Sequence, residues 1–151
     1  MPQSLSMVYI HAVFSTKERR KSLQAVSFRN GMHSYLGGIS KQLNCPPLIV
    51  GGVDDHVHIL ARLSRTMTIA AWIMNLKRSS TIWANQTGAL RIPFSWQVGY
   101  GAFSVSVSDV PRVRGYIEEQ VGHHSRFTFQ DEFRVLLRNH GIEWDERYLW
   151  D

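Results

Sequence analysis

The order of apolar patterns along this chain predicts an α+β sandwich, in which helices pack against an antiparallel sheet. Three observations support this fold class. Short runs rich in β-branched and aromatic residues alternate with two longer stretches of helical periodicity. Two of the short runs are separated only by a glycine-containing turn, which indicates a hairpin. Two more helical patterns follow the last short run, so helices are added at the carboxyl end.

The first half of the chain contains three predicted strands and one predicted helix. Leu5 to Ser15 is apolar at nearly every position, as expected of a central strand that is covered on both faces. Apolar residues then recur at helical spacing over roughly Ala25 to Gln42, and Pro46-Pro47 ends this helix. Leu48 to Val53 and His56 to Leu63 are the two strands of the predicted hairpin.

A second helix and a fourth strand are predicted next. Thr66 or Thr68 can cap the helix, and an apolar stripe from Ile69 to Trp83 forms its buried face. Residues 84–94 are predicted to form a loop. Trp96 to Val107 is rich in β-forming residues but contains two glycines, which predicts a strand with a bend or a bulge.

Two helices and an aromatic tail complete the predicted elements. Ser108-Asp109 is a helix start, and this helix should run to about His124. Thr128 opens the next helix with an acidic residue three or four positions later, and Gly141 ends it. The tail from Ile142 to Asp151 carries several large aromatic residues. We expect it to dock on another surface, such as that of a partner subunit.

Strand, helix, strand, strand, helix, strand is the element order of a ferredoxin-like (RRM-like) sandwich, with βαββαβ topology and helices on one face of the antiparallel sheet. We predict this fold for residues 1–151 as a single domain, in which the added C-terminal helices and tail start at about residue 108. In this topology the first and third strands form the central pair. The strand from His56 to Leu63 would therefore lie in the middle of the sheet.

Composition indicates a basic, globular protein. Lys and Arg outnumber Asp and Glu by 17 to 12, which gives a net charge of +5 and a pI near 9.7. Such an excess favours a polyanionic partner such as nucleic acid. A solvated loop is the alternative interpretation for the basic cluster that follows the first predicted strand. The candidate phosphate contacts are this cluster and a pair on the second predicted helix: Lys17, Arg19, Arg20, Lys21, Lys77 and Arg78.

The single cysteine and the lengths of the apolar runs bear on the compartment. Cys45 has no partner for an internal disulfide and cannot build a thiolate zinc site, so a reducing cytosol is the default. The longest apolar run inside a helical pattern, Ile69 to Met74, is far shorter than a membrane span, and no signal peptide opens the chain. We expect a cytoplasmic protein without a membrane partner.

Two histidines on one predicted strand suggest a metal site. In Asp55-His56-Val57-His58 the side chains alternate across the strand, so His56 and His58 share one face. Neutral imidazoles bind divalent cations well, and a strand holds two of them at a fixed separation. Asp55 is a candidate to orient a ligand histidine. Strand histidines with ordinary hydrogen bonds and a turn aspartate are the alternatives.

A third ligand and a nucleophile can be sought on the helix that follows the last predicted strand. Tyr116 and Gln120 are spaced i, i+4 and share one helix face. Gln120 offers an amide oxygen suited to Mg²⁺ or Mn²⁺, and Tyr116 offers a phenol that can form a covalent phosphotyrosine. Tyr116 alone would be interpreted as a tyrosine that packs on the sheet. His11 could approach the site, although a core histidine is the better interpretation.

Five segments in this order resemble the HUH (His-hydrophobe-His) single-tyrosine transposases of small bacterial insertion sequences, the IS200-like family, which includes REP-associated tyrosine transposases. The His-x-His pattern alone is weak, whereas the five segments together are specific. The similarity spans almost the whole chain. The matching segments are Val13–Lys17, Asp55–Leu60, Trp96–Val105, Tyr116–Gln120 and His123–Trp150.

The resemblance implies a ferredoxin-like homodimer that acts on single-stranded DNA, needs Mg²⁺ or Mn²⁺ and uses no nucleotide cofactor. It carries the metal histidines of the family to His56 and His58, the glutamine ligand to Gln120 and the nucleophile to Tyr116. The tyrosine would attack a DNA phosphate and leave a 5′-phosphotyrosine and a free 3′-hydroxyl, which later attacks another such linkage. In relatives the tyrosine helix can complete the site of the partner, and the sequence leaves both arrangements open.

DNA strand transfer in transposition is therefore the function that the sequence favours, with hairpin-bearing single strands as the substrate. A mobile-element enzyme and a host enzyme acting on dispersed palindromes are both compatible with it. A non-catalytic module that binds single-stranded nucleic acid is the alternative from a different class, because basic charge and exposed aromatic residues would serve it equally well. A metal-dependent phosphodiesterase that uses water is a third, but it gives no reason for a tyrosine beside the ligands.

Overall fold

The sheet has the strand order and the antiparallel pairing that the sequence predicts. The computed structural model describes residues 3–123 and 126–150. All neighbouring strands in it are antiparallel, in the order β2-β3-β1-β4, so β1 and β3 are the central pair of an α+β, ferredoxin-like sandwich. The strands are β1 (Tyr9–Ser15), β2 (Pro47–Gly52), β3 (His56–Arg62) and β4 (Gly101–Val105).

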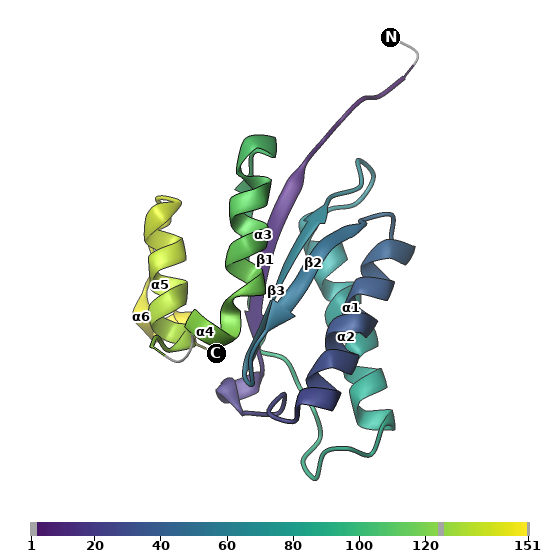
Figure 1. Ribbon diagram of the computed structural model, residues 1–151, viewed down its shortest axis with the longest axis vertical. Helices are drawn as coiled ribbons and strands as arrows, with labels where there is room; N and C mark the ends of the chain where they lie inside the picture. Colours follow the sequence, from purple (N-terminus) through teal and green to yellow (C-terminus); the bar gives the residue numbers. More distant parts are fainter. Residues whose placement is uncertain (1–2, 124–125, 151) are drawn as a thin grey trace.

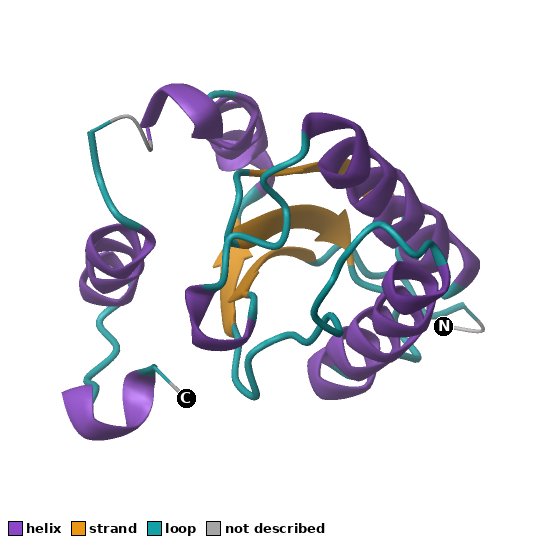
Figure 2. Ribbon diagram, turned by 90° about the horizontal axis from the view of Figure 1, so that it is seen from below, coloured by secondary structure: helices purple, strands orange, loops and turns teal. Residues whose placement is uncertain are grey.

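Helices lie on both sides of this sheet, as Figures 1 and 2 show. One face carries the two helices of the βαββαβ unit, α1 (Val26–Gln42) and α2 (Ile69–Gln86). The other side carries the added helices α3 (Val110–Glu118), α4 (Gln120–His123), α5 (Phe129–Asn139) and α6 (Glu146–Leu149). Two 3-10 helices, η1 (Lys17–Arg19) and η2 (Val107–Asp109), follow β1 and β4. Within the described ranges, no helix combines the length and the apolar character that a bilayer span requires.

Side-chain alternation along β3 separates the main core from the candidate site. Val57 and Ile59 are fully buried in the apolar cluster beneath α1 and α2. Leu60 faces the other way and packs against the apolar residues of α3. His56 and His58 share the side of Leu60, so the strand period places both imidazoles under the added helices.

Two glycines allow the added helices to approach the sheet closely. At Gly51 in β2, a Cβ atom would lie 2.8 Å from Ile117 Cγ2 of α3. At Gly101 in β4, a Cβ atom would lie 2.5 Å from Phe133 Cε1 of α5. Both distances are shorter than the contact distance of two carbon atoms. A side chain at either glycine would therefore push a helix away from the sheet and from the two histidines.

Two strands are shorter than predicted, for reasons that involve tertiary contacts. β1 begins at Tyr9 rather than at Leu5, because β3 and β4 both end opposite Tyr9. β4 begins only at Gly101, five residues later than predicted. The carbonyl oxygens of residues 97–99 accept hydrogen bonds from the Lys77 ammonium, which holds this segment outside the ladder.

The helix after β4 is interrupted, whereas the sequence predicts one helix to about His124. α3 ends at Glu118, and the backbone of Glu119 leaves the helical region with φ −94° and ψ 16°. α4 then starts at Gln120. Tyr116 and Gln120 therefore lie on two helices instead of on one continuous face. The predicted end near His124 lies outside the described residues.

α5 has the predicted caps, and the tail packs on it. The Thr128 hydroxyl accepts a hydrogen bond from Asp131 N at 3.2 Å, and Gly141 follows the helix with φ 68°. Trp144 and Trp150 pack into the cluster formed by the apolar face of α5. The tail therefore docks on another surface, as expected, and this surface belongs to its own chain.

Candidate active site

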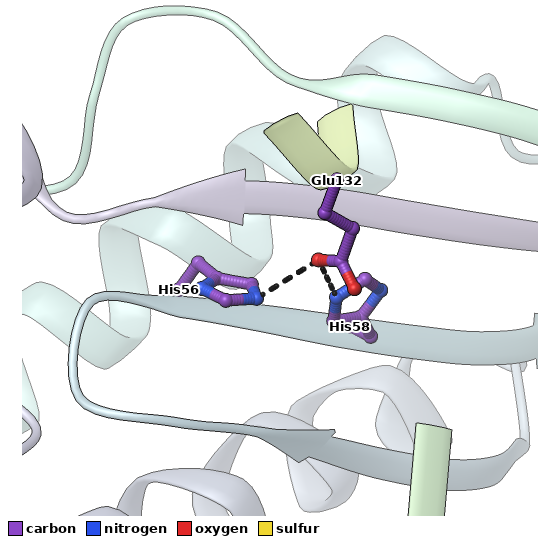
Figure 3. A group of neighbouring side chains, drawn as sticks. All are labelled: His56, His58 and Glu132. Atoms are coloured by element: carbon purple, nitrogen blue, oxygen red, sulfur yellow. Dashed lines mark hydrogen bonds and ion pairs between the residues drawn. The ribbon is translucent and has the colours of Figure 1, made fainter. Parts of the chain in front are cut away.

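Two buried histidines of β3 face a carboxylate that projects from α5, as Figure 3 shows. His56 Nε2 lies 3.2 Å from Glu132 Oε1, and His58 Nε2 lies 3.0 Å from the same oxygen. Each of the three residues offers one ligand atom, and these atoms lie within 4.8 Å of one another. Neither imidazole is exposed, and Glu132 is only 8% exposed. Three donor groups from two distant segments therefore converge on one point.

The second nitrogen of each imidazole has a partner of its own. His56 Nδ1 lies 2.7 Å from Asp55 Oδ1, and His58 Nδ1 lies 2.8 Å from His11 Nε2. With both Nδ1–H groups donating to these acceptors, both rings direct Nε2 to the common point. Asp55 thus has the contact that its predicted orienting role requires. His11 is buried, as a core histidine should be, but it is also hydrogen-bonded to the site.

Tyr116 and Gln120 reach the same carboxylate from α3 and α4. The Tyr116 hydroxyl donates to Glu132 Oε2, and Gln120 Nε2 donates to that oxygen at 3.0 Å. Gln120 Oε1 lies 3.2 Å from His56 Nε2. The two side chains therefore meet despite the break between their helices. All of these contacts are made within one chain.

Burial and hydrogen bonding set the protonation states at this point. Burial lowers the pKa of His56, but the hydrogen bonds to Asp55 and Glu132 outweigh it and raise this pKa to about 9. Burial raises the pKa of the Tyr116 phenol, and the charge of Glu132 raises it further. Burial is also the main cause that holds the pKa of His11 well below its usual value. At neutral pH His56 is therefore a cation, whereas Tyr116 and His11 are neutral.

The donor set fits a divalent cation. Two imidazole nitrogens and one carboxylate oxygen are a common ligand set for such ions, and Gln120 Oε1 adds a neutral oxygen beside His56. Carboxylate and amide oxygens suit Mg²⁺ and Mn²⁺ in particular. Binding must displace the Nε2 proton of His56, so the site takes up metal more readily as the pH rises.

Comparison with known proteins identifies the family. Residues 4–120 match the model of the IS200-like transposases. The chain belongs to the IS200-like transposase family. A candidate transposase from Deinococcus radiodurans R1 has a similar structure, with a TM-score of 0.63 and 22% identity over 78% of this chain and 93% of that one. A REP-associated tyrosine transposase bound to a REP hairpin gives a TM-score of 0.60 and 12% identity over 81% of this chain and 71% of that one. No curated protein matches the chain.

Glu132 lies beyond the segment that matches the IS200-like transposases, and sequence reasoning missed it as a ligand. The sequence pattern indicates for Glu132 only a capping role with Thr128. One feature of the sequence indicates that Glu132 is buried: it lies at helical spacing from the apolar residues that form one face of α5, namely Phe129, Phe133 and Leu136. A carboxylate within an apolar stripe must find a buried partner. The partners here are the two histidines of β3.

A basic cluster of this IS200-like transposase lies at the end of the sheet where β3 begins. η1 is joined to the turn before β3 by a hydrogen bond from Thr16 N to Asp55 O at 2.8 Å. Most side chains of the cluster are exposed, and that of Arg19 is half-buried. Its members are the predicted phosphate contacts Lys17, Arg19, Arg20 and Lys21.

Lys77, a predicted phosphate contact, makes hydrogen bonds within the fold. Its ammonium donates to the carbonyl oxygens of residues 97–99 at 2.7 to 3.3 Å. Burial lowers the pKa of Lys77 to about 8. Arg78, the other predicted contact on α2, is exposed and approaches Met74 Sδ at 3.9 Å. Of this pair, Arg78 is exposed and Lys77 is half-buried.

Proposed function

We propose that this chain is a metal-dependent single-stranded DNA endonuclease and strand transferase of DNA transposition that forms a 5′-phosphotyrosine intermediate. The observation that carries the proposal is that the Tyr116 phenol and two buried histidines share the Glu132 carboxylate. A tyrosine beside a candidate cation site suits attack on a phosphate, whereas hydrolysis by water needs no such residue. Membership of the IS200-like family supports DNA transposition as the process.

Mg²⁺ or Mn²⁺ would be held by His56, His58 and Glu132, with the amide oxygen of Gln120 as a further ligand. Such a cation, when bound, polarises a phosphate and stabilises charge on the leaving oxygen. The chain supplies the rest of the arrangement. Burial excludes water from both imidazoles, and the partners at Nδ1 hold their orientation.

In the proposed step the Tyr116 oxygen attacks a DNA phosphate, and its proton passes to Glu132 Oε2, which already accepts the hydrogen bond of this hydroxyl. A bond forms between the tyrosine oxygen and phosphorus. The bond from phosphorus to the 3′ oxygen breaks, and that oxygen takes up a proton to become a free 3′-hydroxyl. A later attack by a 3′-hydroxyl on the phosphotyrosine reverses these changes and rejoins strands. Since each exchange replaces one phosphate ester bond by another, no nucleotide cofactor is needed.

Hairpin-bearing single-stranded DNA is the proposed substrate. The structural neighbour with a bound REP hairpin supports this choice, and so does the net charge of +5. The basic cluster at residues 17–21, together with Arg78, would supply phosphate contacts that do not depend on sequence. A mobile-element enzyme and a host enzyme acting on dispersed palindromes would share this chemistry. Terminal hairpins that border the gene would favour the mobile element.

A denaturing gel tests the proposed chemistry. The protein is incubated with Mn²⁺ and a hairpin-bearing single strand from the flanks of its own gene. We expect a covalent protein–DNA band that is absent with EDTA and absent with Tyr116→Phe. Tyr100→Phe is the matched control, because Tyr100 is 41% exposed and has no contact with Glu132 among the described hydrogen bonds. This variant should form the adduct at the wild-type level.

Other outcomes of the same experiment would contradict the proposal. Cleavage by Tyr116→Phe, or cleavage by the wild type without an adduct, would reject the nucleophile and indicate hydrolysis by water. Binding that is insensitive to metal and to Tyr116, without cleavage, would indicate a non-catalytic single-strand-binding module.

We also propose that each chain cleaves with its own Tyr116. The support is that Tyr116 contacts Glu132 of the same chain, which in turn contacts His58 of that chain. The homodimer expected from the family would then join two independent sites. A mixture of Tyr116→Phe chains and His58→Ala chains should form no adduct. An adduct in this mixture would instead show that the tyrosine serves the partner's site.

A further inference from the structure

A cavity of about 470 Å³ lies between α3 and α5, next to the proposed nucleophile. Tyr116, His11 and Glu132 line it, and so do residues of β4. Figure 2 shows α3 and α5 on the same side of the sheet, standing apart from each other. The volume falls within the range of roughly 300–1,000 Å³ that is typical of pockets for small organic ligands. Tyr116 therefore opens onto a space that attack on a phosphate does not by itself use.

Apolar walls and a larger number of polar groups line the cavity. Val113 of α3 and Val135 and Leu136 of α5 form opposite walls. Ser104 and Asn139 contribute a hydroxyl and an amide, and both residues are exposed. Flat ligands with an apolar face and polar edge groups suit such a lining. A nucleobase is a ligand of this kind.

The charges that line the cavity disfavour a phosphate. Three acidic residues line it, and they outnumber the arginines that line it: Asp109, which pairs with Arg112, Asp131, which pairs with Arg134 outside the lining, and Glu132, which contacts the two histidines. Arg112 is the one guanidinium among the described lining residues, and it already binds Asp109 through two hydrogen bonds of 2.6 and 2.9 Å. Carboxylates repel phosphates but accept hydrogen bonds from the exocyclic amino groups of bases. The electrostatics therefore favour a base over the sugar-phosphate backbone.

We propose that this cavity binds the nucleobase of a nucleotide adjacent to the phosphate that Tyr116 attacks. The proposal rests on the strand-transfer function proposed above. α5 then has two roles, because Glu132 faces the histidines while Val135 and Asn139, about one and two turns later, face the base. A base held at this position fixes the strand on one side of the scissile phosphate. It also lets the site discriminate between nucleotides next to the cleavage point.

Solution NMR of the full-length, ¹⁵N-labelled protein in EDTA tests the base site without any catalytic step. The probes are the four deoxynucleoside 5′-monophosphates, and deoxyribose 5-phosphate is the matched ligand without a base. We expect at least one mononucleotide to cause saturable shifts of the amide signals of Ser104, Val135 and Asn139, and the sugar phosphate to cause none. Equal shifts with both kinds of probe, or shifts confined to residues 17–21, would overturn the proposal.

Three variants sharpen this test. Val135→Trp fills the cavity from a residue that is 47% exposed, and Asn139→Ala removes an amide from its lining. We expect each to weaken mononucleotide binding by about tenfold or more. Val107→Trp makes the same change as the first variant at a residue that is 70% exposed and does not line the cavity, so binding should be unchanged. Undiminished binding by both cavity variants would overturn the proposal.

The readout is independent of the proposed chemistry. Neither Mn²⁺ nor the Tyr116 adduct takes part in mononucleotide binding in EDTA. Failure of the base site would therefore leave the adduct experiment unaffected. Failure to form an adduct would reject the strand-transfer function even if mononucleotides bind in the cavity.

Discussion

Raising the pH from 6.5 to 8 should weaken the stabilisation that His56 gives to the metal-free protein. Burial lowers the pKa of His56 in the fold, but hydrogen bonds to Asp55 and Glu132 raise it to about 9, against 6.5 in the unfolded chain. A raised pKa stabilises the fold fully below pH 6.5, and this stabilisation is lost as the pH rises through 9. Linkage gives a contribution of roughly 3 kcal/mol at pH 6.5 and about half of that at pH 8.

A comparison with His56→Gln isolates this contribution from other titrating groups. The pKa of His33 is lowered to about 4 and that of Lys77 to about 8, mainly by burial. For a basic group, a lowered pKa makes stability rise with pH, which has the opposite sign to the effect of His56. Both groups are present in the wild type and in the variant, so their effects cancel in the difference.

Urea denaturation in EDTA at pH 6.5 and at pH 8 measures this difference. The excess free energy of unfolding of the wild type over His56→Gln should fall to about half between the two conditions. The excess of the wild type over His33→Gln should instead rise with pH. If the His56 difference stays constant or grows with pH, the imidazole is neutral in the fold. The hydrogen-bonded network at the site would then be wrongly assigned.

The remaining predictions concern Mn²⁺ binding, measured by isothermal titration calorimetry. Glu132→Gln should weaken binding by about 10- to 100-fold because it removes the anionic ligand, whereas Asp131→Asn, the same change on the exposed neighbour, should not. Equal affinity of the wild type and Glu132→Gln would remove this residue from the ligand set. The affinity of the wild type should rise by nearly tenfold from pH 7 to pH 8, because binding displaces one proton from His56, and a flat profile would contradict the raised pKa. His11→Phe should weaken binding by about tenfold because the His58 imidazole loses the hydrogen-bond partner that orients it, and His33→Phe, at a half-buried histidine away from the site, should have no effect.

The sheet and the histidine pair were predictable because both follow from local patterns. The strand period alone places His56 and His58 on one face, and the turn before them indicates the hairpin. Element bounds were wrong where contacts from elsewhere decide them. The Lys77 ammonium of α2 donates hydrogen bonds to the carbonyl oxygens of residues 97–99, a segment that the sequence predicts as part of a strand. The backbone of Glu119 leaves the helical region, although the sequence pattern would continue the helix there.

The carboxylate and the supporting histidine of the site depend on tertiary structure. Glu132 is separated from His58 by 74 residues, so no ligand spacing links the two in the sequence. The contact of His11 with His58 depends on the register of β1 against β3, in which Val13 is the residue opposite His58. A single sequence indicates that both strands are central but does not fix their register. Polar residues within apolar stripes can be recognised, whereas the residues that they meet cannot.

Peptide mapping by mass spectrometry of the covalent protein–DNA complex tests the central claim most directly. The wild type is incubated with Mn²⁺ and a hairpin-bearing single strand, and the complex is then trimmed with nuclease and digested with protease. We predict a nucleotide attached through its 5′-phosphate to the peptide that contains Tyr116, with fragmentation placing it on the phenol. A nucleotide on any other residue, or cleaved strands with a free 5′-phosphate and no modified peptide, would contradict this mechanism.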